Sequence, residues 1–526
     1  MKKTQMQSTP LSSNPARKPL LPAWNTARAG ILLWLVFVLF LALVQFSTPD
    51  LPDNDGFYHI KMAYLMWTEG LKPAFSWLPL TILNQAEFSD HHFLYHAALI
   101  PFTFGDLRLG AKWSAVFFAS LAFLSVWNLL KNAHVRYAPL WALGLLALSE
   151  AFIYRMSITR AQSLSLAVLM LGFDWLLRKK YLPLGALAFA YVWLYDAFPL
   201  LLVLSLAVIL SEWHIEKQLD LRPLIYIAAG TALGLVINPY FPQNIIFVVR
   251  HILPKLTDAT AISVGNEWFP YDTAQLLRNS PLALAAFMSG VLALGLSGKR
   301  MDARTLSGFF LSGLFGWMLF QSRRFIEYFP PFALVFAVFA WAPLLEDFQS
   351  KQNQAVNSGE DLRLRMKPIF LSHLPALVLG AIVLAGGWVT FIDARNSLRT
   401  SKSYLTYSGA SAWLTDHTPL GERVFQTDWD DFPCLFFYNT RNTYLVGLDP
   451  TYLSLQNPEL YTQWVAVTRG MVAFPSDSIS EDFGARYILT DLQHTEFLDQ
   501  AAQDPALEEV YRDYDAVVFK VITPGE

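Results

Sequence analysis

The chain has 526 residues, of which 54% are hydrophobic and only 15% are charged, and its formal net charge is −3. Soluble domains carry roughly 25% charged residues, so this composition excludes an ordinary soluble protein, and the near-neutral charge gives no support to bulk nucleic-acid binding. The single cysteine, Cys434, excludes an intramolecular disulfide and a metal site built of thiolates alone. The long apolar blocks predict an α-helical polytopic membrane protein.

The membrane spans are predicted from the apolar blocks, since a helix that crosses a bilayer needs about 20 mostly apolar residues. The first block is Ala29–Phe46, and no small-residue cleavage site follows it, which favours a retained helix over a signal peptide. About eleven spans are expected within a transmembrane domain over residues 29–392. The others lie near 106–130, 137–153, 161–177, 181–195, 197–211, 223–240, 281–297, 305–321, 325–345 and 369–391.

The Lys/Arg content of the short loops predicts the orientation, because cytoplasmic loops are the basic ones. The N-terminal segment 1–28 is basic and is expected in the cytoplasm. The outer loops 48–105 and 241–280 and the tail 393–526 then face the extracytoplasmic side of a cytoplasmic (inner) membrane, which is the periplasm in a bacterium. The polar segment 346–368 is expected to be a flexible cytoplasmic linker.

The tail is about one small domain long. Its short apolar runs Arg486–Asp491 and Ala516–Val521 predict buried strands, and Ser408–Asp416 and Glu496–Ala502 predict helices. A small extracytoplasmic α/β domain is therefore expected over residues 393–526.

Two carboxylates one residue apart, Asp53 and Asp55, follow the first span, and Tyr58 and His59 come just after them. Such a pair can hold a divalent cation or act as a general base near a phosphate-linked group. The alternative is a solvated turn with an Asp helix cap.

A histidine doublet lies later in the same loop, in the run Ser89-Asp90-His91-His92. Asp90 and His91 could complete a metal site with Asp55. The alternative is an interfacial turn before a short helix that contains His96.

Arginines recur at the outer ends of the predicted spans, against the usual charge bias. Arg155 and Arg160 flank one short hairpin, and Arg323 and Arg324 lie in another very short outer loop. Guanidinium groups bind phosphates in bidentate fashion, so a lipid phosphate is a natural partner. Ordinary headgroup anchoring, or a pair of Arg324 with Glu327, remains the alternative.

Two further outer segments combine carboxylates with aromatic residues, namely Glu267-Trp268 in the second loop and Trp429-Asp430 in the tail. A carboxylate in such a setting can reach into a groove and bind a cation or a polar acceptor. A loop that folds on its own aromatics, or a turn between two strands, is the alternative. Asp196 lies at a membrane boundary and could be a polar hairpin tip.

The run Asp53-Asn-Asp-Gly-Phe-Tyr-His59 after a first transmembrane helix resembles the first outer loop of GT-C class glycosyltransferases, in particular the catalytic subunit of oligosaccharyltransferases. These are polytopic enzymes that use polyprenyl-phosphate or polyprenyl-diphosphate sugar donors. The resemblance implies that Asp55 is the catalytic aspartate, with Asp53 as the alternative. It also implies a divalent cation, Mg or Mn, near the acceptor.

Other motifs follow in the same order. Ser263-Val-Gly-Asn-Glu267 resembles the family's Ser-Val-Ser-Glu type motif, which implies a site role for Glu267. Arg323 or Arg324 would match the arginine that touches the donor diphosphate, and Thr427–Asp431 loosely resembles the Trp-Trp-Asp motif. The family's second acidic motif is missing, because Tyr154–Ser163 contains no carboxylate. A general transferase of lipid-linked sugars is therefore expected rather than a true oligosaccharyltransferase.

These observations lead to one hypothesis: a membrane glycosyltransferase that moves a sugar or oligosaccharide from a polyprenyl-linked donor to a glycan, lipid or protein acceptor on the outer membrane face. The donor phosphate would be held by Arg323, Arg324 and Arg155, and Asp55, Asp53 and Glu267 would be catalytic. The acceptor groove would include Tyr58, His59, Trp268, Trp429 and Asp430. A transporter or flippase of lipid-linked sugars, or a non-catalytic scaffold, remains the alternative. An enzyme should bring Asp55, Glu267 and Arg324 to one outer cavity.

Overall fold

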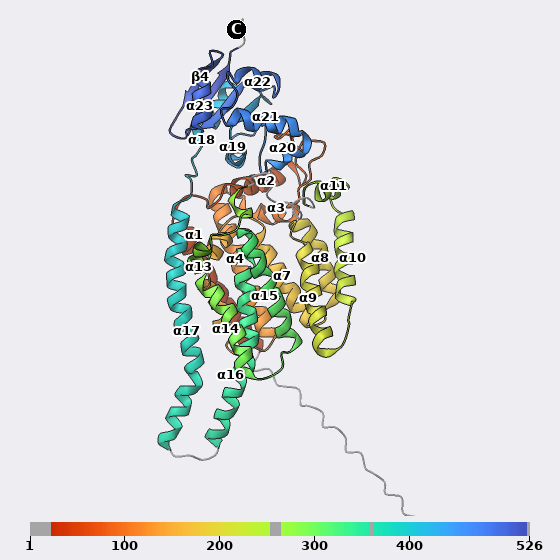
Figure 1. Ribbon diagram of the computed structural model, residues 1–526, viewed down its shortest axis with the longest axis vertical. Coiled ribbons are helices and arrows are strands. Elements are labelled where there is room, and N and C mark those ends of the chain that lie inside the picture. The colour runs from red at the N-terminus through yellow and green to blue at the C-terminus, as the bar shows by residue number, and fades with distance from the viewer. Residues whose placement is uncertain (1–22, 253–264, 358–361, 523–526) are drawn as a thin grey trace, which may run out of the picture.

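The computed structural model describes residues 23–252, 265–357 and 362–522. Long helices run side by side as an elongated bundle, and the C-terminal domain lies on one end of it (Figure 1). The first 22 residues of the predicted N-terminal segment 1–28 lie outside the described part of the chain.

The bundle helices form where the apolar blocks predict them. They are α1 (Ala23–Gln45), α4 (Leu107–Asn132), α7 (Gln162–Leu177), α8 (Tyr181–Leu194), α9 (Pro199–Glu216), α10 (Arg222–Val236), α14 (Pro281–Ser297), α15 (Ala303–Gln321), α16 (Phe329–Asn357) and α17 (Leu362–Arg399). Buried apolar side chains from these helices form the main core of the molecule.

The predicted span 137–153 is broken rather than continuous. It consists of α5 (Ala138–Leu143), a short 3-10 helix η2 (Gly144–Leu146) and α6 (Glu150–Met156). The Ser149 hydroxyl accepts a hydrogen bond from the backbone N–H of Phe152, which starts a new helix inside the apolar block. The two polar residues Ser149 and Glu150 mark this break, but within an apolar block they do not by themselves indicate that the helix ends.

Within the described residues, five helices are long and apolar enough to cross a membrane, or six if the bent pair α13 (Thr273–Asn279) and α14 is one span. Several shorter apolar helices lie among them, including α7, α8 and α10. The chain is a multi-pass membrane protein, whereas the count of about eleven spans stays a prediction.

The expected flexible linker over 346–368 is wrong for the described residues. There α16 continues to Asn357 and α17 begins at Leu362, while residues 358–361 lie outside the description. Gln, Glu, Lys, Leu and Arg are good helix formers, so a polar composition does not by itself end a helix.

The first outer loop is largely structured. It contains α2 (Asp55–Glu69), α3 (Phe93–Leu99) and η1 (Ile100–Phe102). The short helix that contains His96, named in the sequence as the alternative to a metal site, is therefore present as α3. The second outer loop contains α11 (Gln243–Phe247), a π-helical turn η3 (Val248–Ile252), the short 3-10 helix η4 (Asn266–Trp268) and α13. Ser263 and Val264 of the predicted motif lie outside the described residues.

The C-terminal domain is the predicted α/β unit. Its five-stranded sheet has the order β2-β1-β3-β5-β4, in which β2, β1 and β3 are parallel and β5 and β4 complete it in antiparallel fashion. The strands are β1 (Arg423–Gln426), β2 (Thr443–Tyr444), β3 (Tyr487–Asp491), β4 (Leu507–Arg512) and β5 (Ala516–Val521). The helices are α18 (Ser408–His417), η6 (Trp429–Asp431), α19 (Phe432–Tyr438), α20 (Thr451–Gln456), α21 (Pro458–Thr468), α22 (Ser476–Glu481) and α23 (Thr495–Ala501).

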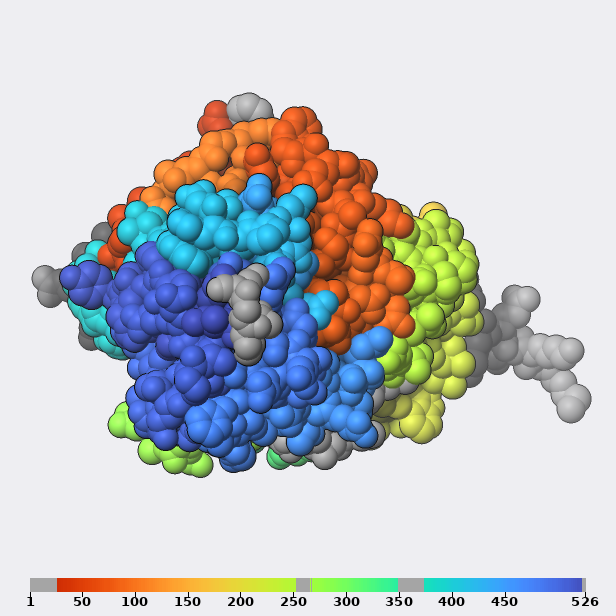
Figure 2. Space-filling view, turned by 90° about the horizontal axis from the view of Figure 1, so that it is seen from above, coloured from red at the N-terminus to blue at the C-terminus, as the bar shows by residue number. Residues whose placement is uncertain are grey.

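The first outer loop and the C-terminal domain share one hydrophobic core. The backbone N–H of Tyr444 in β2 donates to the Trp77 carbonyl at 2.8 Å, and the Trp77 indole donates to the Thr440 carbonyl at 2.8 Å. The Trp77 ring also packs edge-on against Phe436, 4.8 Å between centroids. From above, the two segments together cover most of this end of the bundle (Figure 2).

Candidate active site

A cavity of about 570 Å³ lies where one end of the helix bundle meets the C-terminal domain. Most of the residues singled out in the sequence line it, although they come from positions far apart in the chain. These are Asp53, Asp55, Tyr58, His59, His91, Arg155, Glu267, Trp268, Arg324, Trp429 and Asp430. The cavity therefore brings together Asp55, Glu267 and Arg324, the arrangement expected of an enzyme.

Asp55 is the first residue of α2 and points at an arginine. Its Oδ2 lies 2.6 Å from Nη2 of Arg160, and its backbone N–H donates to Asp53 Oδ1 at 2.9 Å. The neighbouring Asn54 side chain donates to the carboxylate and carbonyl of Asp430, at 2.9 and 3.0 Å. The carboxylate pair at the helix start is thus fixed by a guanidinium on one side and by the C-terminal domain on the other.

Glu267 in η4 is shared by three guanidinium groups. Its Oε2 accepts from Arg155 at 2.9 Å and from Arg160 at 3.1 Å, and its Oε1 lies 3.4 Å from Nη1 of Arg324. Arg324 also donates to the Tyr195 hydroxyl and lies over the Trp268 ring, 5.0 Å from its centroid. The Glu267 carboxylate therefore contacts three positively charged side chains at one side of the cavity.

Burial and charge move the pKa values of these two carboxyl groups in opposite directions. Burial raises the pKa of Asp55 to about 6, although the Arg160 charge opposes the shift. Burial alone would also raise the pKa of Glu267, but the three guanidinium groups hold it well below its ordinary value. Asp55 can therefore exchange a proton near neutral pH, whereas Glu267 stays ionised.

The two arginines of the 322–328 segment have different surroundings. Arg324 lines the cavity, while Arg323 points away from it, donates to the Pro270 carbonyl at 3.2 Å and lies over the Tyr271 ring. Both residues belong to the 3-10 helix η5 (Arg323–Glu327), whose geometry sends consecutive side chains in different directions. The structure thus does not bring Arg323 to the site.

Glu327 pairs with Arg155 rather than with Arg324. Its fully buried Oε1 accepts from Nε of Arg155 at 2.9 Å and also from Nη2. Glu327 thus holds one end of the Arg155 guanidinium, and Glu267 holds the other end.

The predicted ligands Asp55, Asp90 and His91 do not form one group. Asp90 is 4% exposed and does not line the cavity. Its Oδ2 lies 2.7 Å from Nδ1 of His96, whose Nε2 lies 2.8 Å from Nδ1 of His59. The short helix α3 turns His96 toward Asp90, so Asp90 supports a buried histidine pair instead of facing the cavity.

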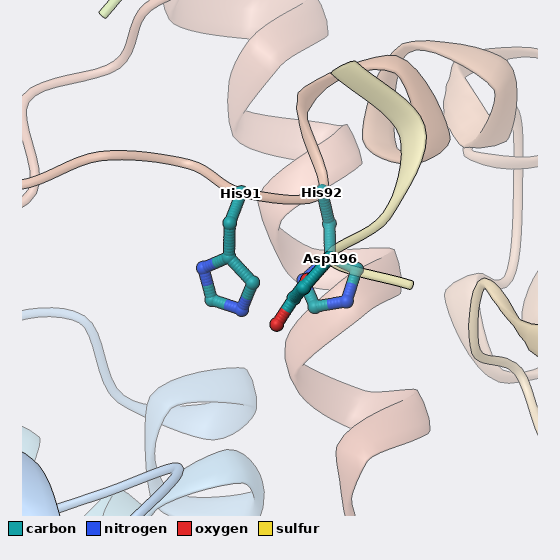
Figure 3. A group of neighbouring side chains, drawn as sticks. All are labelled: His91, His92 and Asp196. Carbon is teal, nitrogen blue, oxygen red and sulfur yellow. The ribbon is translucent and has the colours of Figure 1, made fainter. Parts of the chain in front are cut away.

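The residues around Asp55 do not fit a divalent cation, because the Arg160 guanidinium already occupies the ion-pair position at its carboxylate. Among the described residues, a different group has the donor set of a metal site: one ligand atom each from His91, His92 and Asp196, all within 4.8 Å of one another (Figure 3). Two imidazoles and a carboxylate fit a first-row transition metal.

Several lining residues had no assigned role in the sequence. The sequence predicts Arg160 only as an outer arginine and Asp196 only as a hairpin tip, whereas His92 belongs to the doublet that could supply metal ligands. Tyr195 and Asp449 also line the cavity, and the sequence pattern around them indicates no site role for either.

No protein-family model and no curated protein matches the chain by sequence. Solved structures, in contrast, match over nearly its whole length. The oligosaccharyltransferase AglB from Archaeoglobus fulgidus, in complex with an inhibitory peptide and a dolichol-phosphate, has 13% identity and a TM-score of 0.64, covering 92% of this chain and 72% of that chain.

Two other transferases give similar matches. ArnT from Cupriavidus metallidurans bound to undecaprenyl phosphate has 14% identity and a TM-score of 0.56, covering 93% of this chain and 97% of that one. The mycobacterial arabinofuranosyltransferase AftD has 15% identity and a TM-score of 0.55, covering 96% of this chain and 42% of that one. The resemblance that the first-loop motif indicates is thus confirmed at the level of structure: the chain has the fold of the GT-C membrane glycosyltransferases.

Proposed function

We propose that the protein is a membrane glycosyltransferase that moves a sugar or oligosaccharide from a polyprenyl-phosphate or polyprenyl-diphosphate donor to an acceptor bound in the cavity. The observation that carries this proposal is the meeting of three arginines and a protonatable aspartate, Asp55, in one cavity at the outer end of the bundle.

The donor phosphate would bind at the arginine wall, the side of the cavity that Arg155, Arg160 and Arg324 form. Guanidinium groups stay charged and present paired N–H donors that match phosphate oxygens. Arg324 is the central candidate because its contact with Glu267 is long, 3.4 Å, and its other hydrogen-bond partner is the uncharged hydroxyl of Tyr195, which a phosphate can replace. Arg155 and Arg160 add positive charge behind it. The same wall would stabilise the negative charge that develops as the phosphate leaves.

Asp55 would act as the general base. Its pKa of about 6 leaves it ionised at neutral pH and able to accept a proton from the acceptor nucleophile. In a single displacement, the bond from the acceptor heteroatom to the anomeric carbon forms as the bond from that carbon to the phosphate oxygen breaks. The proton passes to Asp55 and the electron pair to the phosphate, which inverts the anomeric configuration.

The remaining carboxylates and aromatic side chains would either orient the arginines or contact the acceptor. Glu267 is ionised and held by three arginines, so it would orient them instead of taking a proton. Tyr58, His59, Trp429 and Asp430 line the side of the cavity formed by the first loop and the C-terminal domain, and would contact the acceptor.

The test starts with the lipid. The full-length protein is purified in mild detergent and its co-purifying lipids are weighed by native mass spectrometry. A polyprenyl-linked sugar bound to the wild type and to Arg323→Ala, but lost from Arg324→Ala, is the expected result. Only bulk phospholipid, unchanged in Arg324→Ala, would remove the donor site.

Binding of the donor alone would also suit a transporter. A transfer assay with the recovered lipid and Asp55→Asn separates the two functions, because an enzyme loses transfer but keeps the lipid. Full activity of both Asp55→Asn and Arg324→Ala would contradict the mechanism.

A further inference from the structure

We propose that His91, His92 and Asp196 form a binding site for a divalent transition metal of the zinc type, in the same cavity as the ion pair of Asp55 with Arg160. All three side chains line the cavity. His91 and His92 come from the loop that leads into α3, and Asp196 follows the end of α8, so two separate elements supply the ligands (Figure 3).

The two imidazoles are held in place by aromatic contacts. The His91 ring stacks on Phe247 at 4.7 Å and 17°, and the His92 ring packs against Tyr195 at 5.4 Å. One ligand atom from each of the three side chains lies within 4.8 Å of the others. Rings with fixed orientation around a common point need little rearrangement to bind an ion.

An unpartnered oxygen points independently to a ligand. Oδ1 of Asp196 is buried and accepts no hydrogen bond within the described part of the chain. A buried carboxylate oxygen without a donor is costly, and native proteins usually supply a partner. A cation held between Asp196 and the two histidines would supply it.

Outer contacts of the kind that support metal ligands are also present. Asp90 accepts a hydrogen bond from the backbone N–H of His92 at 2.9 Å, and its other oxygen lies 2.7 Å from His96. A buried carboxylate that anchors the backbone of a ligand residue restricts where its imidazole can point. This gives Asp90 a positioning role behind the doublet, in place of direct ligation.

The donor set selects the class of metal. Two imidazoles and one carboxylate suit zinc, iron, cobalt or nickel, whereas Mg²⁺ prefers oxygen ligands and near-ideal octahedral geometry. Three protein ligands also leave a coordination position open, as in catalytic zinc sites. That position would face the cavity, where an anionic or hydroxyl-bearing molecule could bind.

The experiment measures metal binding directly. Full-length protein, purified in detergent with a histidine-free tag, is stripped with a chelator and titrated with Co²⁺, whose visible absorption reports its coordination. Zinc content is then measured after equilibration with equimolar Zn²⁺ in excess Mg²⁺. About one equivalent per chain is expected for the wild type. Asp196→Asn and His92→Ala should bind at least about tenfold more weakly.

Matched variants keep the result interpretable. His214→Ala removes an exposed histidine at the far end of α9 and should bind as the wild type does. Asp196→Asn is nearly isosteric, and an unchanged thermal unfolding curve shows that it folds. Less than about a tenth of an equivalent in the wild type, or unchanged affinity in the triple variant His91→Ala/His92→Ala/Asp196→Asn, would overturn the site. No donor or acceptor is used, so this result is independent of the transferase proposal.

Discussion

The guanidinium of Arg160 lies 2.6 Å from the carboxylate of Asp55, where the first-loop motif predicts a cation. Arg160 comes from the hairpin in which the family's second acidic motif is missing. A covalently attached positive charge thus stands beside the proposed base. Unlike a bound ion, this charge cannot be removed by a chelator, and it couples the protonation of Asp55 to the arginine wall.

Replacing Asp55 tests its role as the base. Asp55→Asn keeps the size of the side chain but cannot accept a proton, so the transfer rate should fall by about 10²–10⁴. Binding of the lipid donor should persist, as judged by native mass spectrometry. Asp53→Asn is the matched control, because Asp53 lies two residues away and its carboxylate accepts a hydrogen bond from the Asp55 backbone N–H. Equal losses in both variants would count against a special role for Asp55.

The rate of transfer should depend on pH through Asp55. Because burial raises its pKa to about 6, the carboxylate is ionised above that pH and protonated below it. Activity should therefore be level at neutral pH and fall about tenfold for each unit below 6. Since the Arg160 charge lowers this pKa, Arg160→Gln should move the fall to higher pH. A pH–rate profile of both proteins gives the answer, and a fall that does not move in the variant would assign it to another group.

Glu267 should compete with phosphate for the arginines. Two unit charges about 4 Å apart interact by about 1 kcal/mol in water and about 4 kcal/mol near a protein surface. Removing the charge in Glu267→Gln should therefore tighten the binding of pyrophosphate by about tenfold or more, measured by titration calorimetry. Weaker binding would mean that the orientation Glu267 gives the three guanidinium groups outweighs its competition with the phosphate.

Glu327 should matter for stability. It is fully buried and pairs with Arg155, so Glu327→Gln leaves an incompletely compensated charge inside the protein. A loss of about 3–5 kcal/mol is expected, seen as a lower thermal unfolding midpoint. Glu509→Gln removes one half of the exposed pair with Arg512 and should cost less than about 1 kcal/mol. Similar midpoints for the two variants would show that the buried pair is dispensable.

Asp431 should make the stability of the protein fall with rising pH. Burial raises its pKa to about 7 in the folded state, whereas an unfolded aspartate ionises near pH 4. The folded protein is favoured fully below pH 4, and this contribution is lost as the pH rises to 7. Asp431→Asn cannot ionise, so it should be more stable than the wild type at pH 8 by on the order of 1–4 kcal/mol.

Thermal unfolding of Asp431→Asn and the wild type at pH 4 and pH 8 isolates this group. The difference between the two proteins should appear only at the higher pH, because the other titrating groups are common to both. An equal difference at both pH values would indicate a packing effect of the substitution instead.

Much of the secondary structure could be predicted from local sequence patterns. The strand Ala516–Val521 forms over the predicted residues, and bundle helices form at ten of the predicted apolar blocks, because burial period and hydropathy are local properties. The Asp55 motif begins helix α2 at the end of the bundle that carries the C-terminal domain, which matches the helix cap named as the alternative in the sequence.

The partners of the site residues could not be predicted from the sequence. Nothing in the spacing of Arg155 and Arg160 tells which carboxylate each meets, since Glu267 lies more than a hundred residues away. The direction of Arg323 depends on one 3-10 turn, and the partner of Asp90 depends on how α3 packs. Such choices follow from tertiary contacts that a single sequence does not encode in any local pattern.

The bond between the Trp77 indole and the Thr440 carbonyl joins residues 363 positions apart in the chain. At a synthesis rate of about 5–20 residues per second, the first outer loop waits roughly 20–70 s for its partner to be made. During that interval, the aromatic side chains that later pack on the C-terminal domain face the aqueous side of the membrane uncovered. The protein is therefore prone to aggregation while the C-terminal domain is still being synthesised. A ribosome that stalls within the last hundred residues leaves this aromatic surface exposed.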